Sequence, residues 1–120
     1  MNTNNISLLD CTLRDGGYIT KWDFGEEVIK GVAQALVDAN LEYVEVGYLN
    51  NKPYEEGSAL FHDINQMIDF IPKDRKNSTI LAMADVTQFT KEDLVPFDGR
   101  SIDGIRVVFY KHQIEEALEF

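Results

Sequence analysis

The stretch Leu8-Leu9-Asp10-Cys11-Thr12-Leu13-Arg14-Asp15-Gly16-Gly17-Tyr18 starts as an apolar run and ends in a guanidinium, a carboxylate and two glycines. The run is too short for a helix and is bounded by turn residues, so it predicts a buried strand over residues 6–13. Arg14 and Asp15 then follow the carboxyl end of that strand, the edge at which parallel α/β folds bind ligands. Gly16 and Gly17 allow close backbone approach. The stretch predicts a binding loop, although a surface Arg-Asp pair before a glycine turn would explain the same residues.

Composition favours one acidic domain. The chain has 120 residues, 44% hydrophobic content and a net charge of -10. This charge would repel nucleic acid and anionic membranes, so we expect neither as a partner. Cys11 is the one cysteine, and in the middle of a strand we expect it to be a small buried hydrophobe. Residues 1–5 do not resemble a leader and no apolar segment approaches the ~20 residues that span a bilayer, so we expect a cytoplasmic protein.

Helical signals follow the opening stretch. Asp23 predicts a helix N-cap, with Glu26 completing a capping box, and Asn40 predicts the helix end. Ser58 predicts the cap of a second helix that ends at Pro72. The expected buried face of the first helix consists of Val28, Val32, Ala35, Leu36 and Ala39.

Strands are expected between these helices. β-branched and aromatic residues predict a strand over residues 43–48, and two further strands are expected over residues 79–84 and 105–110. A short capped turn is expected over residues 90–94, and a last helix from His112 onward. The alternation of strand and helix predicts parallel strands joined by right-handed crossovers.

The number of units bounds the architecture. A closed barrel needs eight βα units in roughly 250 residues, and about four units are visible here. We therefore expect an α/β fold in which residues 1–120 form a single domain, either a small open sheet or the amino-terminal half of a TIM barrel. Such a sheet has unpaired edges and an apolar inner face, so we expect homo-oligomers formed through the exposed half-barrel surface.

The residues Asp10 to Gly16 resemble the D-x-T-L-R-D-G signature of the DRE-type TIM-barrel metallolyases, the group similar to hydroxymethylglutaryl-CoA lyase. The segment Val44-Glu45-Val46-Gly47 resembles the E-x-G sequence of that family's second strand. Phe109-Tyr110-Lys111-His112 is most similar to the 4-hydroxy-2-oxovalerate aldolase branch. The resemblance spans the whole chain but only about half of such a barrel, and it supports the amino-terminal half-barrel interpretation.

The resemblance implies chemical roles at the opening stretch. Asp15 matches a carboxylate ligand of Mg or Mn, and carboxylates suit such hard cations. Arg14 matches an arginine that stabilises an enolate oxygen, for which a planar, permanently charged fork is suited. Glu45 would orient a water, a ligand or Arg14, or else be a buried carboxylate satisfied by a neighbouring strand. Gly16 and Gly17 would approach the substrate.

Two further positions complete the expected site. Tyr18 stands where the aldolase branch has an acid/base histidine, and an ordinary phenol pKa near ~10 makes it a poor base although it could bind substrate. Arg106 shares a strand face with Val108, so we expect it to face the substrate. The family completes its metal site with a His-x-His pair, whereas this chain has only His62 and His112, in no such arrangement.

The implied function is the amino-terminal part of a metal-dependent aldolase or lyase that cleaves or forms a C-C bond in a 2-oxo acid through an enolate. The isolated chain is expected to be inactive, with Mn or Mg bound only in a full-length parent. An aldehyde dehydrogenase is the partner that the resemblance implies. Two alternatives remain open at this point: a noncatalytic α/β module that binds a small anion, and an acyl-CoA condensing synthase of the Claisen type.

Overall fold

A computed structural model describes residues 5–120 as a parallel sheet with its main helices on one face. The sheet order is β1-β2-β4-β5, β3 pairs with the end of β2, and every pairing is parallel. This confirms the predicted parallel α/β fold. The strands are β1 (Leu9–Asp10), β2 (Tyr43–Leu49), β3 (Leu60–Phe61), β4 (Thr79–Asp85) and β5 (Gly104–Val108).

Helical segments connect these strands. The α-helices are α1 (Thr12–Asp15), α2 (Gly17–Thr20), α3 (Glu26–Asp38) and α4 (Ile114–Glu119). The 3-10 helices are η1 (Ile64–Phe70), η2 (Lys91–Asp93) and η3 (Lys111–Gln113). The short turn expected over residues 90–94 is η2, where Thr90 and Asp93 form the predicted cap. No helix among residues 5–120 is long and apolar enough to cross a membrane.

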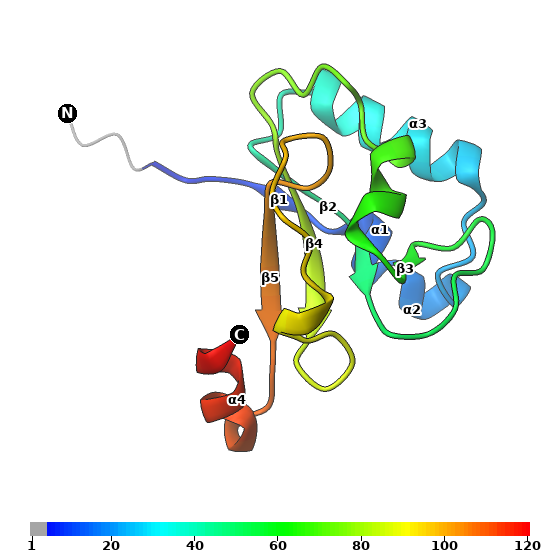
Figure 1. Ribbon diagram of the computed structural model, residues 1–120. Helices are drawn as coiled ribbons and strands as arrows, with labels where there is room; N and C mark the ends of the chain where they lie inside the picture. Colours follow the sequence, from blue (N-terminus) through cyan, green and yellow to red (C-terminus); the bar gives the residue numbers. More distant parts are fainter. Residues whose placement is uncertain (1–4) are drawn as a thin grey trace.

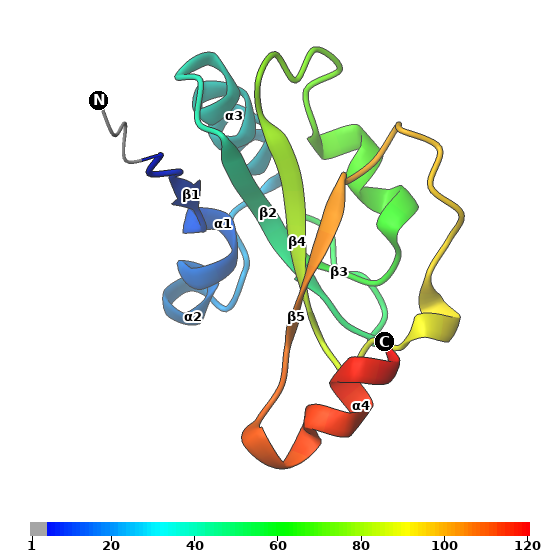
Figure 2. The ribbon, with the colours of Figure 1, turned by 90° about the vertical axis from the view of Figure 1, so that its left-hand side faces the viewer.

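The core lies between the sheet and one layer of helices. α3 and η1 pack on the same face, as the edge-on view shows (Figure 1). Turned by 90°, the sheet presents β1, β2, β4 and β5 side by side, and neither α3 nor η1 covers the face toward the viewer (Figure 2). Strand residues alternate between these faces, so side chains next to one another along β2 point to opposite sides. The buried strand residues of the core are Val44, Val46, Leu49, Phe61, Ile80, Ala82 and Ala84.

The opening strand is shorter than predicted. Only Leu9–Asp10 pairs with β2, because the Asp10 carboxylate accepts hydrogen bonds from the Thr12 N-H and hydroxyl at 2.9 and 3.0 Å and turns the chain into α1. The prediction of a strand over residues 6–13 is therefore wrong in extent. The expectation of a buried Cys11 is wrong too, because this residue precedes α1 and is partly exposed. Leu13 still enters the core, but from a helical turn.

Both predicted helix starts are wrong, and the same tertiary contact explains both. Asp23 and Ser58, each expected to cap a helix, instead form an antiparallel bridge with one another. The first helix consequently begins three residues after Asp23, at Glu26. The second helix, η1, begins at Ile64, where Asp63 and Gln66 form a capping box. The segment before η1 forms β3 instead of helix.

The helical period was predicted correctly, and Val32 and Leu36 pack against the core as expected, but the centre of the buried face was not predicted. Ile29, Ala33 and Val37 are fully buried, whereas Val28 is 49% exposed. Ala35 and Ala39 are exposed as well, so the buried face is centred one position after the expected one. The predicted helix end is confirmed, because Asn40 adopts a φ of 59° directly after the cap residue Ala39. At the other end of the chain, β5 stops at Val108, and the extension of that strand to residue 110 is wrong.

Candidate functional site

The centre of the candidate site is Glu45, a buried carboxylate held by two arginines. Val44 and Val46 point into the core, so Glu45 lies on the sheet face that α3 and η1 leave uncovered. Its side chain is nevertheless 0% exposed. Arg14 donates from Nε to Oε1 at 2.6 Å, and Arg106 donates from Nη1 to Oε2 at 2.8 Å. The two ion pairs compensate the burial of this charge.

Arg14 is positioned by the turn that follows β1. Its carbonyl oxygen accepts a hydrogen bond from the Trp22 indole N-H at 2.8 Å, and its Nη1 donates to Asp15 at 2.9 Å. The indole lies so close to Gly17 that a Cβ atom there would stand 2.0 Å from the ring. Gly17 is therefore required for packing, because only a residue without a side chain lets the indole reach the backbone.

The charge of Arg14 is secured by its partner. Partial burial by itself lowers the pKa of Arg14, but the hydrogen bond and negative charge of Glu45 outweigh this effect, and the pKa of Arg14 is raised above its usual value. Glu45 and the exposed Asp15 accept only some of the N-H groups of the two guanidinium groups, so the remaining N-H groups can bind a further anionic group. The side chains of Arg14 and Arg106 are 14% and 40% exposed, and each keeps N-H groups beyond those bound to Glu45.

The structure brings together some of the residues predicted for the site. Arg14, Glu45 and Arg106 meet directly, although they come from three different parts of the chain. Asp15 is 65% exposed and touches Arg14. Tyr18 is also 65% exposed and packs edge-on against Trp22, with 4.7 Å between ring centroids. Their chemical roles remain predictions.

Gly16 and Gly17 were expected to approach the substrate, and Asp15 was expected to bind a metal ion. Gly16 caps α1 and lies beside the packed Gly17 rather than beside Glu45. Asp15 is the residue that the resemblance assigns to a metal ion. Within residues 5–120, no group of three or more His, Cys, Asp or Glu side chains is arranged to hold a metal ion. The residues that the structure describes therefore do not form a complete metal site.

A cleft of about 390 Å³ opens at the carboxyl ends of the strands. Tyr48 and Asn50 line it at the end of β2, and Asp85 lines it at the end of β4. Tyr18 and Trp22 form the wall nearest to Arg14. The sequence analysis placed no site residue at Tyr48, Asn50 or Asp85. The sequence contained a signal for these residues, because each lies at or just after the end of a predicted parallel strand, where such sheets bind ligands.

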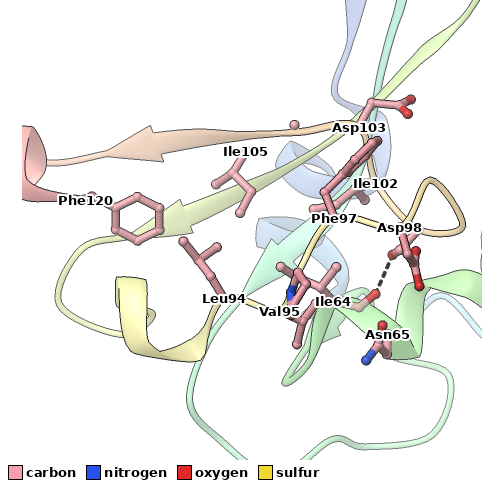
Figure 3. A pocket seen from close by; sticks show the side chains of 13 residues that line it. Ile64, Asn65, Leu94, Val95, Phe97, Asp98, Ile102, Asp103, Ile105 and Phe120 are labelled. Atoms are coloured by element: carbon pink, nitrogen blue, oxygen red, sulfur yellow. Dashed lines mark hydrogen bonds between the residues drawn. The ribbon is translucent and has the colours of Figure 1, made fainter.

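A second, more apolar pocket of about 250 Å³ lies away from this cluster (Figure 3). Ile64 of η1, the segment around Val95 and Phe120 contribute to its wall, together with Ile105. Ile105 packs against the core, whereas the next residue, Arg106, reaches Glu45. Because neighbouring strand residues point to opposite faces, this pocket and the arginine cluster lie on opposite sides of β5.

Comparison with known proteins gives one informative likeness. No protein-family model matches the chain, and no curated protein matches it. Among solved structures, the crystal structure of the N-terminal domain of a "putative aldolase" from Bacteroides vulgatus is similar, with a TM-score of 0.73 and 30% sequence identity. The match covers 95% of this chain but only 39% of that one. This agrees with the expected half barrel, and the chain is similar in fold and sequence to part of an aldolase amino-terminal domain.

Proposed function

We propose that this chain supplies the enolate-stabilising part of an aldolase active site that acts on a 2-oxo acid. The observation that carries the proposal is the clamp formed by Arg14, Glu45 and Arg106. A guanidinium fixed in position by a buried carboxylate is preorganised for an oxygen that gains negative charge, and preorganised donors of this kind lower the barrier to enolate formation. The similarity to an aldolase domain supports the same chemistry.

The residues of the clamp have distinct roles in this proposal. In the cleavage direction, a base removes the proton of the substrate hydroxyl group, the C-C bond breaks, and the bonding electrons move to the oxygen of the 2-oxo group. Arg14 stabilises the resulting enolate oxygen through the N-H groups that Glu45 and Asp15 leave free. Arg106, the more exposed guanidinium, binds the substrate carboxylate. The aldehyde product leaves, and the enolate takes up a proton.

Two parts of the site are not assigned to described residues. Asp15 would contribute one carboxylate to a Mg or Mn ion, and the remaining ligands would have to come from outside these 120 residues. Tyr18, the residue at the acid/base position, has no hydrogen-bond partner for its hydroxyl among residues 5–120. We therefore assign no base, and we propose that the chain alone does not complete the reaction.

The experiment that tests this proposal compares pyruvate with lactate, which lacks the 2-oxo group. Calorimetric titration of the chain should show weak binding of pyruvate, and Arg14→Met should reduce its affinity by about tenfold, the loss of one charge-assisted hydrogen bond. Arg100→Met is the matched control, because Arg100 is 70% exposed and, among residues 5–120, its side chain pairs only with Asp98. Equal pyruvate affinity in the Arg14 and Arg100 variants, or no pyruvate binding at all, would contradict the proposal.

A noncatalytic module that binds a small anion is the second candidate, because the N-H groups of Arg14 and Arg106 that Glu45 leaves free can hold a carboxylate without any reaction. Such a module would bind lactate and pyruvate equally well through their common carboxylate. The aldolase proposal requires a preference for pyruvate, because Arg14 contacts the oxygen of the 2-oxo group.

A further inference from the structure

The cleft at the carboxyl ends of β2, β4 and β5 contains polar groups that the clamp does not use. Trp22 forms one wall of it, and the Trp22 indole also holds the Arg14 carbonyl oxygen, so the cleft adjoins the clamp. Its volume of about 390 Å³ suits a small molecule. The aromatic side chains around it are Tyr18, Trp22, Tyr48, Phe109 and Tyr110.

Asn50 provides the most specific feature of the cleft. It is only 5% exposed, and its Oδ1 accepts a hydrogen bond from the Lys52 backbone N-H at 3.0 Å, which establishes which amide atom is the oxygen. Its Nδ2 has no hydrogen-bond acceptor within residues 5–120. No fully buried side-chain nitrogen or oxygen of the described residues lacks a partner, so this nitrogen must reach solvent. Since Asn50 lines the cleft, Nδ2 opens into it.

Three neighbouring groups are also available. Burial and the negative charge of Asp85 raise the pKa of Tyr48 to about 12, so its hydroxyl stays protonated and can donate. Asp85 accepts two hydrogen bonds from Thr87 at Oδ1, and its Oδ2 has no donor among the residues that the structure describes. Lys52 also lines the cleft and makes no ion pair with any described residue, and its charge is opposite to that of Asp85.

These groups together select a chemical class of ligand. Aromatic walls contact C-H groups, while an amide donor, a phenol and a carboxylate oxygen match hydroxyl groups, which both donate and accept. The balanced charge of the cleft gives no preference for an ion. We propose that this cleft binds a short, neutral, polyhydroxylated chain, with Asn50 Nδ2 donating to one of its hydroxyl oxygens. If the proposed aldolase function holds, on which this assignment rests, the ligand is the aldehyde half of the substrate.

The test uses erythritol, a neutral four-carbon polyol without a reactive carbonyl group, and butan-1-ol, which has the same carbon chain and one hydroxyl group. Trp22 is the only tryptophan of the chain and lines the cleft, so its fluorescence reports occupancy. Ligand-observed NMR gives an independent measure of binding. Erythritol should bind more tightly than butan-1-ol.

Asn50→Asp keeps the oxygen that accepts the Lys52 N-H and replaces the donor nitrogen, so it should weaken erythritol binding by about fivefold to tenfold. Asn51→Asp makes the same change of charge at an exposed position outside the cleft and should leave the affinity within about twofold. Circular dichroism of both variants establishes that they fold. Equal affinity for the two alcohols, or equal loss in the two variants, overturns the inference.

The erythritol experiment on the cleft and the pyruvate experiment on the clamp can succeed or fail independently. Pyruvate binding that depends on Arg14, without erythritol binding, would overturn the assignment of the cleft and leave the aldolase proposal in place. Erythritol binding that depends on Asn50, without pyruvate binding, would support the polyol site and remove the reason to describe its ligand as an aldehyde.

Discussion

The replacement of Arg14 by methionine should destabilise the chain far more than the same replacement of Arg106. Both side chains bind Glu45, which is 0% exposed, but Arg14 is 14% exposed and Arg106 is 40% exposed. At an effective dielectric constant of about 20, unit charges about 4 Å apart attract by about 4 kcal/mol. Loss of one partner of a buried pair costs about 3–5 kcal/mol, because the other charge stays buried.

We therefore expect Arg14→Met to lower the free energy of unfolding by about 3 kcal/mol, at the lower end of that range because Arg106 still binds Glu45. Arg106→Met should lower it by about 1 kcal/mol, since solvent screens the more exposed pair. Urea unfolding followed by Trp22 fluorescence measures both values. Arg100→Met, at an exposed ion pair, is the control and should change the free energy by less than about 0.5 kcal/mol.

A triple variant distinguishes a functional clamp from a stabilising one. Replacing Arg14 and Arg106 by methionine and Glu45 by leucine removes all three charges at once, so no buried charge is left unpaired. Apolar replacement of buried ion pairs is often neutral or stabilising, and we expect the triple variant to recover to within about 1 kcal/mol of the original chain. If Arg14→Met alone is as stable as Arg100→Met, Glu45 does not depend on Arg14 and the reasoning is refuted.

Three further outcomes are expected. Gly17→Ala should displace Trp22 and shift its emission to longer wavelength, and unchanged emission would contradict the packing described. Gly31→Ala, where a Cβ atom meets no other atom within 4 Å, should instead stabilise α3 by about 0.5–1 kcal/mol. In an ultraviolet titration, Tyr48→Phe should remove the phenol that ionises near pH 12. Because the folded-state pKa of Tyr48 lies above the usual value of 10.0, its contribution to stability is complete below pH 10 and is lost as the pH rises through about 12. We also propose that copies of the chain pair through the edge of β5, so light scattering should show a mass that rises with concentration; a monodisperse monomer would argue against this.

The order of strands and helices could be predicted from the sequence because it depends on repeated patterns of residue type. The mainly apolar segments that form β2 and β4 can be recognised from their own residues, and their alternation with helices implies parallel pairing. The arginine motif could be selected as a candidate because it follows a strand, and its role in binding stays a prediction. Its contact with Glu45 was expected only as one of several roles for that residue.

The failed predictions share a physical cause, which is that a capping residue has alternatives. Asp23 and Ser58 are both good helix caps by residue type, yet the tertiary fold pairs them with one another, 35 positions apart in the sequence. Asp10 lies in β1 as predicted, but its carboxylate accepts a hydrogen bond from the Thr12 N-H and ends the strand before the predicted end at residue 13. The position of Asn50 after a strand was a signal for a cleft residue, but its unpaired Nδ2 could not be predicted, since that depends on the hydrogen bonds of the folded chain.

The central claim is that a 2-oxo acid binds at Arg14 and Arg106. The most direct measurement is an NMR titration of the chain, labelled with 15N at arginine, in which the Nε-H signals are followed as pyruvate is added. The account predicts that the signals of Arg14 and Arg106 shift together and saturate, whereas the signal of the exposed Arg100 stays in place. Shifts at Arg100 with unchanged signals from Arg14 and Arg106 would contradict it.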